Sequence, residues 1–252
     1  ADLAAKYKNA EATVLVFLRR LDDLETVHKA LAKKTDRPIV LLTGTMRGRE
    51  RDDLIQTAEF RRFRGGAESG ETVYLLCTSA GEVGIDISAD HMVCDLTPMD
   101  SMAQRLGRVN RYGSGKARID VVHLTEFDQK DKLAPACKKA LELLKKLPQC
   151  STPDDESGGI EYDASPLALM KALDSPAKSE AFSPEPTILP ATDILFDAWA
   201  MSTIRQKMPG RPALAPYLHG VAEWEPPRTG VAWREEVEHI SEKLLGHYGD
   251  DF

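Results

Sequence analysis

The sequence is poor in cysteine and in long apolar runs. Its four cysteines are widely spaced, with no C-x-x-C pair, so neither a zinc site nor a disulfide framework is expected. Apolar runs such as residues 14–18 are far too short to span a bilayer, and the charged first residues contain no signal-peptide core. These absences exclude a membrane protein and predict a cytoplasmic chain. The chain begins with Ala1 rather than Met, which predicts a piece of a longer protein.

The charge is unevenly distributed along the 252 residues. The net charge of −7 argues against a general nucleic-acid coat, yet residues 1–127 hold equal numbers of basic and acidic residues. The whole excess of acid therefore lies in the remainder, where the residue pattern also changes. We expect a first domain over residues 1–127, a connecting helix over 128–148 and an accessory region over 149–252.

In the first half, short apolar segments alternate with segments of helical period. Strands are expected at residues 13–18, 38–43, 72–77, 91–96 and 117–124, and helices at 21–34, 49–63, 99–110 and 129–147. Nearly continuous apolar strands that alternate with helices indicate βαβ units. The expected fold is therefore α/β, a parallel sheet with helices on both faces.

The accessory region is expected to be smaller and mostly helical, with one β-hairpin. A polar linker comes first, and the pattern then predicts a helix over 193–206, a hairpin within 220–235 and a last helix over 235–245. Trp224 and Trp233 lie on the expected hairpin. They could stack on bases or contact a protein partner, but packing against the adjacent helix is the favoured interpretation.

Three arginines follow one another at intervals of three. On a helix, Arg105, Arg108 and Arg111 would share one face and repel one another unless an anion lay there. Guanidinium groups are well suited to binding phosphate. Gly107 would let a ligand or a neighbouring backbone approach closely. The plain alternative is a solvated basic face.

A polar loop comes directly after the expected third strand. In a parallel sheet, ligands gather at the carboxyl ends of strands, where Thr78 and Ser79 could donate hydrogen bonds to phosphate. Asp86 could accept a hydrogen bond from a ribose hydroxyl or position an arginine. An ordinary turn that Asp86 caps is the alternative. A phosphate site gains support from the arginines that follow.

These segments together resemble a known family. Residues 78–87, TSAGEVGIDI, and 104–111, QRLGRVNR, resemble motifs V and VI of superfamily-two helicases and translocases. Residues 14–31 and 41–53 resemble motifs IV and IVa, in the order found in the second of that family's two RecA-like domains. The sequence is most similar to the helicase part of the CRISPR-associated type I helicase–nuclease effector, and residues 209–235 suggest its U (also called G) subtype.

The resemblance implies a role for particular residues. It implies an ATP-dependent single-stranded-DNA helicase acting in antiviral CRISPR interference, with Arg108 and Arg111 as arginine fingers and Gln104 positioning them or the attacking water. The residues implied in binding ATP are Gly84, Asp86 and Arg105. The residues implied in contacting DNA, or in coupling DNA to the nucleotide, are Arg19, Thr43, Gly44, Thr78, Ser79 and Glu82.

The resemblance also implies partners that this chain needs. No G-x-x-x-x-G-K-[ST] phosphate loop or strand-end acidic box is present, so ATP and Mg²⁺ are expected only in the complete protein, with a missing N-terminal RecA-like domain. The further partners are single-stranded DNA and the CRISPR RNA-guided surveillance complex. No nuclease metal site is expected from the scattered histidines. The alternatives are a non-catalytic RecA-like binding module and the motor half of another superfamily-two translocase.

Overall fold

A computed structural model describes two compact units of the chain. The described residues are 1–65, 70–113, 115–128, 130–150, 160–174, 178–201, 203 and 211–221. The first unit runs from Ala1 to Pro184, and the second begins at Glu185. The division therefore falls later in the chain than the boundary expected at 148/149.

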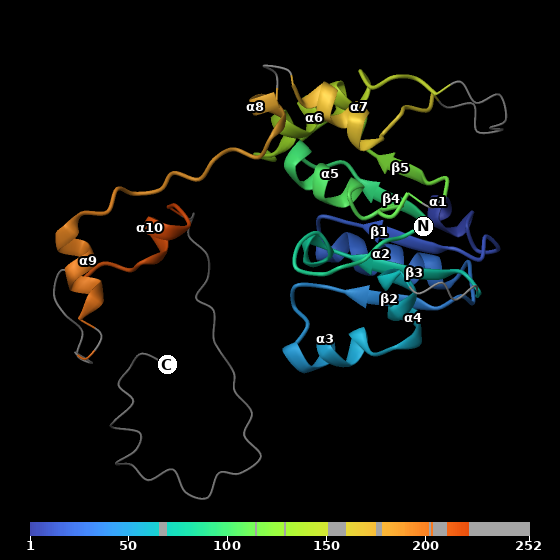
Figure 1. Ribbon diagram of the computed structural model, residues 1–252, viewed down its shortest axis with the longest axis horizontal. Helices are drawn as coiled ribbons and strands as arrows, with labels where there is room; N and C mark the ends of the chain where they lie inside the picture. Colours follow the sequence, from blue (N-terminus) through green and yellow to red (C-terminus); the bar gives the residue numbers. More distant parts are fainter. Residues whose placement is uncertain are drawn as a thin grey trace, which may run out of the picture. The chain divides into compact units, whose positions relative to one another are not determined.

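The described part of the first unit is built on a five-stranded sheet. Its strands are β1 (Thr13–Phe17), β2 (Ile39–Leu42), β3 (Val73–Cys77), β4 (His91–Asp95) and β5 (Arg118–Val122). Their order is β2-β3-β1-β4-β5, and every neighbouring pair is parallel (Figure 1). The expected parallel α/β sheet is confirmed. Because every pair is parallel, the carboxyl ends of all five strands lie at the same edge of the sheet.

Helices cover both faces of the sheet. One face carries α1 (Asp2–Ala5) and α2 (Leu21–Ala32). The elements that pack on the other face are α3 (Gly48–Ile55), α4 (Ala58–Arg61), the 3₁₀ turns η1 (Arg62–Arg64) and η2 (Ser79–Gly81), α5 (Met99–Leu106), α6 (Ala134–Leu144), α7 (Pro166–Leu173) and α8 (Lys178–Ala181).

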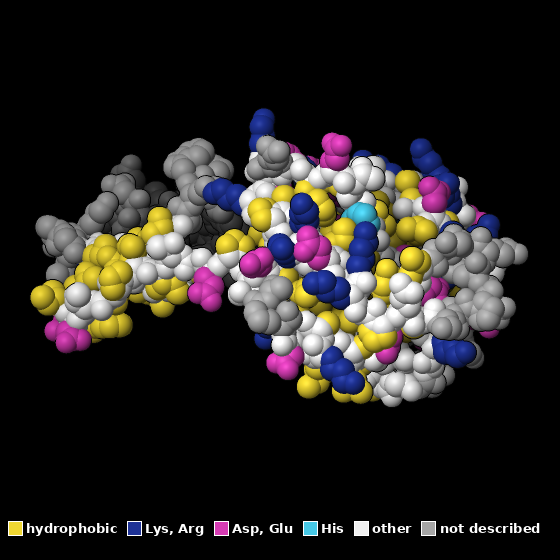
Figure 2. All heavy atoms as spheres, turned by 90° about the horizontal axis from the view of Figure 1, so that it is seen from above, with side chains coloured by type: hydrophobic (Ala, Val, Ile, Leu, Met, Phe, Trp, Pro, Cys, Tyr) yellow, Lys and Arg dark blue, Asp and Glu magenta, His cyan; other side chains and the backbone are white. Residues whose placement is uncertain are grey.

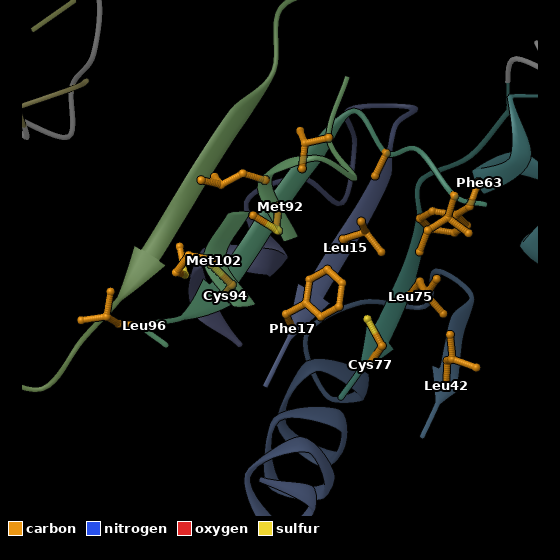
Figure 3. Packing of buried hydrophobic residues seen from close by; sticks show 14 of the residues in the cluster. Leu15, Phe17, Leu42, Phe63, Leu75, Cys77, Met92, Cys94, Leu96 and Met102 are labelled. Atoms are coloured by element: carbon orange, nitrogen blue, oxygen red, sulfur yellow. The ribbon is translucent and has the colours of Figure 1, made fainter. Parts of the chain in front are cut away.

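The core follows from the alternation of side chains along each strand. In β1, Val14 and Val16 pack with α1 and α2, whereas Leu15 and Phe17 point to the opposite face. Figure 3 shows Leu15 and Phe17 among side chains from β2, β3, β4 and α5. Since all five residues of β1 are buried, the nearly continuous apolar run expected of a two-sided parallel sheet is present.

The helix expected over residues 49–63 is interrupted. It ends at Ile55, and Thr57 caps α4 by accepting a hydrogen bond from the Phe60 N–H. The same hydroxyl donates to the Leu54 carbonyl. Threonine favours such caps over helix interiors. Beyond the break, Phe60 and Phe63 are both fully buried.

Residues 160–174 and 178–184 belong to the first unit. Helix α8 packs against α6. Just beyond α8, the backbone N–H and the hydroxyl of Ser183 both donate to Asp100 Oδ1 on α5, at 3.0 and 3.1 Å. Ser183, which the composition assigned to the accessory region, thus contacts α5, the helix that carries Gln104 and Arg105.

The second unit contains α9 (Asp193–Ala200) and α10 (Ala215–Leu218). Trp199 makes edge-on contacts with Phe196 and Tyr217 and donates to the Pro212 carbonyl. Hydrophobic side chains are gathered on its described part (Figure 2). The helix expected over 193–206 is confirmed for 193–200. The expected hairpin with its two tryptophans and the helix over 235–245 lie outside the described residues.

Within the described ranges, no helix combines the length and the hydrophobicity that a membrane span requires.

The buried thiols offer a test of this core. Burial raises the pKa of Cys94 to about 12 and raises that of Cys77 far above its ordinary value, so both thiols stay protonated and unreactive. Iodoacetamide at pH 8 should modify the exposed Cys150 and leave Cys77 and Cys94 intact, as read by peptide mass spectrometry. Urea should expose all four cysteines. Equal labelling of Cys77 and Cys150 in the folded chain would contradict the core.

Candidate functional site

The parallel topology gathers most of the predicted DNA-contacting residues at one edge. Arg19 follows β1, Thr43 and Gly44 follow β2, and Thr78 and Ser79 follow β3. These three strands are neighbours in the sheet. The pairing continues just past the strands, because the Thr78 N–H donates to the Leu42 carbonyl and the Leu18 N–H to the Cys77 carbonyl.

These residues differ in how accessible they are. Gly44 and Ser79 are exposed. Thr43 is only 8% exposed, and its hydroxyl is hydrogen-bonded to that of Thr45 at 2.9 Å. Gly44 and Ser79 can therefore meet a ligand as they stand, whereas the Thr43 side chain is committed locally.

Arg19 is already engaged with a distant part of the chain. Its guanidinium lies 2.5 Å from Asp131 Oδ2, and its backbone N–H donates to Asp95 Oδ2 at 2.7 Å. The hydrogen bond between the side chains of Arg19 and Asp131 raises the pKa of Arg19 and lowers that of Asp131. A phosphate would have to replace the Asp131 carboxylate to bind this arginine.

Arg105 is buried, which differs from the prediction that it binds ATP. Its side chain is 1% exposed and lies over the ring of Phe17, 5.2 Å from the centroid. Its Nε donates to Glu82 Oε1 at 2.7 Å and its Nη1 to Asp95 Oδ1 at 2.6 Å. In this structure the guanidinium faces two carboxylates of the chain itself.

The two carboxylates keep Arg105 charged inside the fold. Burial by itself would lower the pKa of its guanidinium, but Asp95 and Glu82 outweigh this effect and raise that pKa. Ser101 adds a hydrogen bond to Glu82 Oε1 at 2.8 Å. A buried charge with paired and hydrogen-bonded partners escapes the large cost of an isolated one. The cluster joins the end of β4, the loop after β3 and helix α5.

The expectation that three arginines share one helix face is wrong. Helix α5 ends at Leu106. Beyond it the Ala89 N–H donates to the Arg108 carbonyl at 2.9 Å and the Asn110 N–H to the Ala89 carbonyl at 2.8 Å. The chain therefore leaves the helix to pair with residues after the motif V loop, at a bridge between Ala89 and Val109. Gly107, a poor helix former, marks the end.

Arg108 and Arg111 both point to the motif V loop, residues 78–87. Arg108 Nη2 donates to the Glu82 carbonyl at 2.6 Å, and Arg111 Nη1 lies 2.7 Å from Asp86 Oδ1. The sequence left several roles open for Asp86. In the structure its carboxylate is paired with an arginine, Arg111. The Arg111 side chain is 44% exposed, so it can exchange this carboxylate for another anion.

The remaining predicted residues flank these arginines. Gln104 is exposed on the last turn of α5. Gly84 has a φ of 81° with open space around its Cα, which suits a backbone that a ligand approaches closely. The repulsion expected between Arg105, Arg108 and Arg111 is relieved, because each guanidinium donates to a carboxylate or carbonyl oxygen of the chain.

Sequence reasoning missed three residues of this site, Asp95, Ser101 and Asp131, and gave Asn110 of motif VI no role. Asp95 could have been found, because a carboxylate at the end of a buried apolar strand needs a partner. Asp131 carries no such signal, since only the fold brings it to Arg19. The described residues contain no group of three His, Cys, Asp or Glu side chains that could hold a metal ion.

Part of the first unit matches a known family. Residues 10–114 match the family model of the C-terminal region of the CRISPR-associated nuclease/helicase Cas3. Residues 10–114 are therefore similar to the C-terminal domain of a Cas3-type helicase. The expected second RecA-like domain of a superfamily-two helicase is thereby confirmed. A comparison with curated proteins gives no match.

Several solved structures are similar to this chain at low sequence identity. A crystal structure of a CRISPR-associated protein is 15% identical, with a TM-score of 0.51, covering 79% of this chain and 22% of that chain. T. fusca Cas3-AMPPNP is 16% identical with a TM-score of 0.48 and coverages of 80% and 23%. The C-terminal domain of the DEAD-box protein Dbp5 is 22% identical, with a TM-score of 0.39 and coverages of 56% and 77%. The chain thus spans less than a quarter of these CRISPR-associated chains.

Removing one carboxylate tests the buried cluster. Glu82→Gln leaves Arg105 with the Asp95 carboxylate as its one charged partner. Losing a charged partner of a buried ion pair costs on the order of 3 kcal/mol of unfolding free energy. Urea denaturation of the chain measures the change. Glu25→Gln, at an exposed position of α2, is the control and should shift stability by less than about 0.5 kcal/mol. Equal stability of the two variants would contradict the structural role of Glu82.

Proposed function

We propose that this chain is the C-terminal half of an ATP-dependent single-stranded-DNA helicase or translocase of CRISPR type I interference, of the U or G subtype. Its proposed partners are an N-terminal RecA-like domain and a CRISPR RNA-guided surveillance complex. The proposed place of action is the cytoplasm. One observation carries the proposal. Arg108 and Arg111 are held by the motif V loop, within a Cas3-like domain.

The two arginines supply electrostatic stabilisation in this mechanism. When the other RecA-like domain presents a nucleotide across the cleft, Arg108 and Arg111 donate to the γ-phosphate and neutralise the charge that develops during transfer. The loop holds both side chains near one another in advance. Gln104 orients them or the attacking water, and Asp86 releases Arg111 or binds the ribose. Gly84 leaves room for the nucleotide.

The residues present fit an anion but not a metal. Hydrogen-bond donors face the edge, whereas Glu82 and Asp95 are committed to Arg105. Mg²⁺ and the phosphate cradle are therefore assigned to the other domain. When bound, Mg²⁺ would neutralise phosphate charge. Alone, this chain binds neither cofactor productively.

DNA would lie along the carboxyl edge of the sheet, where the motif V loop begins. The backbone and hydroxyl groups at Gly44, Thr78 and Ser79 are suited to phosphate oxygens. Arg19 would join them by exchanging Asp131 for a phosphate. Glu82 stands between the two regions, because its carboxylate holds Arg105 and its carbonyl holds Arg108. Movement of the motif V loop on DNA would therefore shift an arginine finger.

Replacing the fingers tests the nucleotide assignment. In the complete protein, Arg108→Ala or Arg111→Ala should slow DNA-stimulated phosphate release by about 10³–10⁵-fold, as loss of an arginine finger does elsewhere. Arg20→Ala, which removes an exposed arginine near Asp22, is the control. The isolated chain should release no phosphate. Normal turnover by both finger variants would favour the non-catalytic binding module.

Salt dependence tests the DNA assignment. On one face of the first unit, basic side chains are interspersed with acidic and apolar ones (Figure 2), so binding relies on a few local contacts. A labelled single-stranded oligonucleotide should bind weakly, with a shallow fall in affinity as salt rises. Ser79→Glu, which adds a charge at the edge, should weaken binding further, and Glu25→Gln should not. If binding maps to residues 185–252, the assignment is wrong.

A further inference from the structure

Asn110 adopts a backbone conformation that most side chains avoid. Its φ is 45°, in the left-handed region, and among the described residues only Glu11 is another non-glycine with positive φ. A Cβ atom makes this region costly, but asparagine tolerates it better than most residues because its side chain hydrogen-bonds locally. The position therefore selects asparagine or glycine.

The side chain of Asn110 explains why asparagine rather than glycine suits this position. Its Nδ2 donates to the Gly115 carbonyl at 2.6 Å, and its Oδ1 accepts from the Gly115 N–H at 3.2 Å. Its backbone carbonyl also accepts from the Gly113 N–H. The amide thus closes the turn after Arg111 with a pair of hydrogen bonds that glycine lacks.

The turn at Asn110 separates the two proposed fingers. On one side, the Asn110 N–H and the Arg108 carbonyl pair with Ala89. On the other side, the Arg111 N–H donates to Ser88 Oγ at 3.1 Å while its guanidinium meets Asp86. The two stretches of chain on either side of Asn110 therefore contact residues 86–89. The left-handed residue between them sets the direction of the second stretch.

We propose that Asn110 is a positioning residue for Arg111, which fixes the finger through its left-handed backbone and its hydrogen bonds to Gly115. This inference rests on the proposed function. Glycine at this position would keep the backbone but lose the amide. Aspartate would keep one acceptor but place a carboxylate against the Gly115 carbonyl. Alanine would lose both the conformation and the hydrogen bonds.

ATP hydrolysis by the complete protein tests the proposal. Asn110→Ala should lower kcat by about 10²-fold, the cost of misplacing a catalytic group by an ångström. The kcat values of Asn110→Gly and Asn110→Asp should lie between that of Asn110→Ala and that of the unaltered protein. KM for ATP should change by less than about threefold, because a finger acts mainly in the transition state. Asn9→Ala, at an exposed asparagine, is the control. A rise in KM without loss of kcat would overturn the proposal.

A double-mutant cycle separates positioning from general stability. In an Arg111→Lys background, which keeps a charge but not the guanidinium fork, Asn110→Ala should cause less than a threefold further loss. Two results would overturn the positioning role but leave the arginine-finger assignment intact. One is that the losses of kcat in the double variant are fully additive. The other is that the loss of kcat across the Gly, Asp and Ala variants of Asn110 follows the melting temperature alone. If Arg111→Lys and Arg111→Ala both hydrolyse ATP normally, the finger assignment and this inference fail together.

Discussion

A charged guanidinium in the core constrains the arrangement of this site. Arg105 has 1% of its side chain exposed, and burying a charge without partners is prohibitively costly. Asp95 must therefore stand at the end of β4, and Glu82 must turn inward from the motif V loop. These two requirements fix the loop relative to the sheet and to α5. An apolar residue of similar volume could fill the same space, but it would not hold Glu82.

The placement of Glu82 determines what lies outside the core. With its carboxylate held by Arg105 and Ser101, its carbonyl faces outward to Arg108. Gly81 permits this packing, because a Cβ there would lie 2.8 Å from Cys77 Sγ. Asp95 also accepts from the Arg19 N–H, so the same pair of carboxylates connects the proposed DNA edge with the proposed nucleotide edge.

The sequence was sufficient for the sheet but not for the site. Apolar runs identified all five strands. The fully buried β1 and β3 show why: a strand buried on both faces leaves a pattern that needs no tertiary information. The arginine spacing suggested one helix face, and that was wrong, since backbone pairing of Ala89 with Arg108 and Asn110 cannot be read from periodicity. Burial of Arg105 and the pairing of Arg19 with Asp131 likewise depend on residues far away in the chain. The motifs located the site, whereas its geometry came from long-range contacts.

The central claim is that the motif V loop presents Arg108 and Arg111 to a nucleotide. A crystal structure of the complete protein with a non-hydrolysable ATP analogue and Mg²⁺ tests it most directly. Both guanidiniums should lie about 3 Å from γ-phosphate oxygens, while Arg105 stays between Glu82 and Asp95. A bound nucleotide with Arg108 and Arg111 turned away from its phosphates, or with Arg105 on the γ-phosphate, would contradict it.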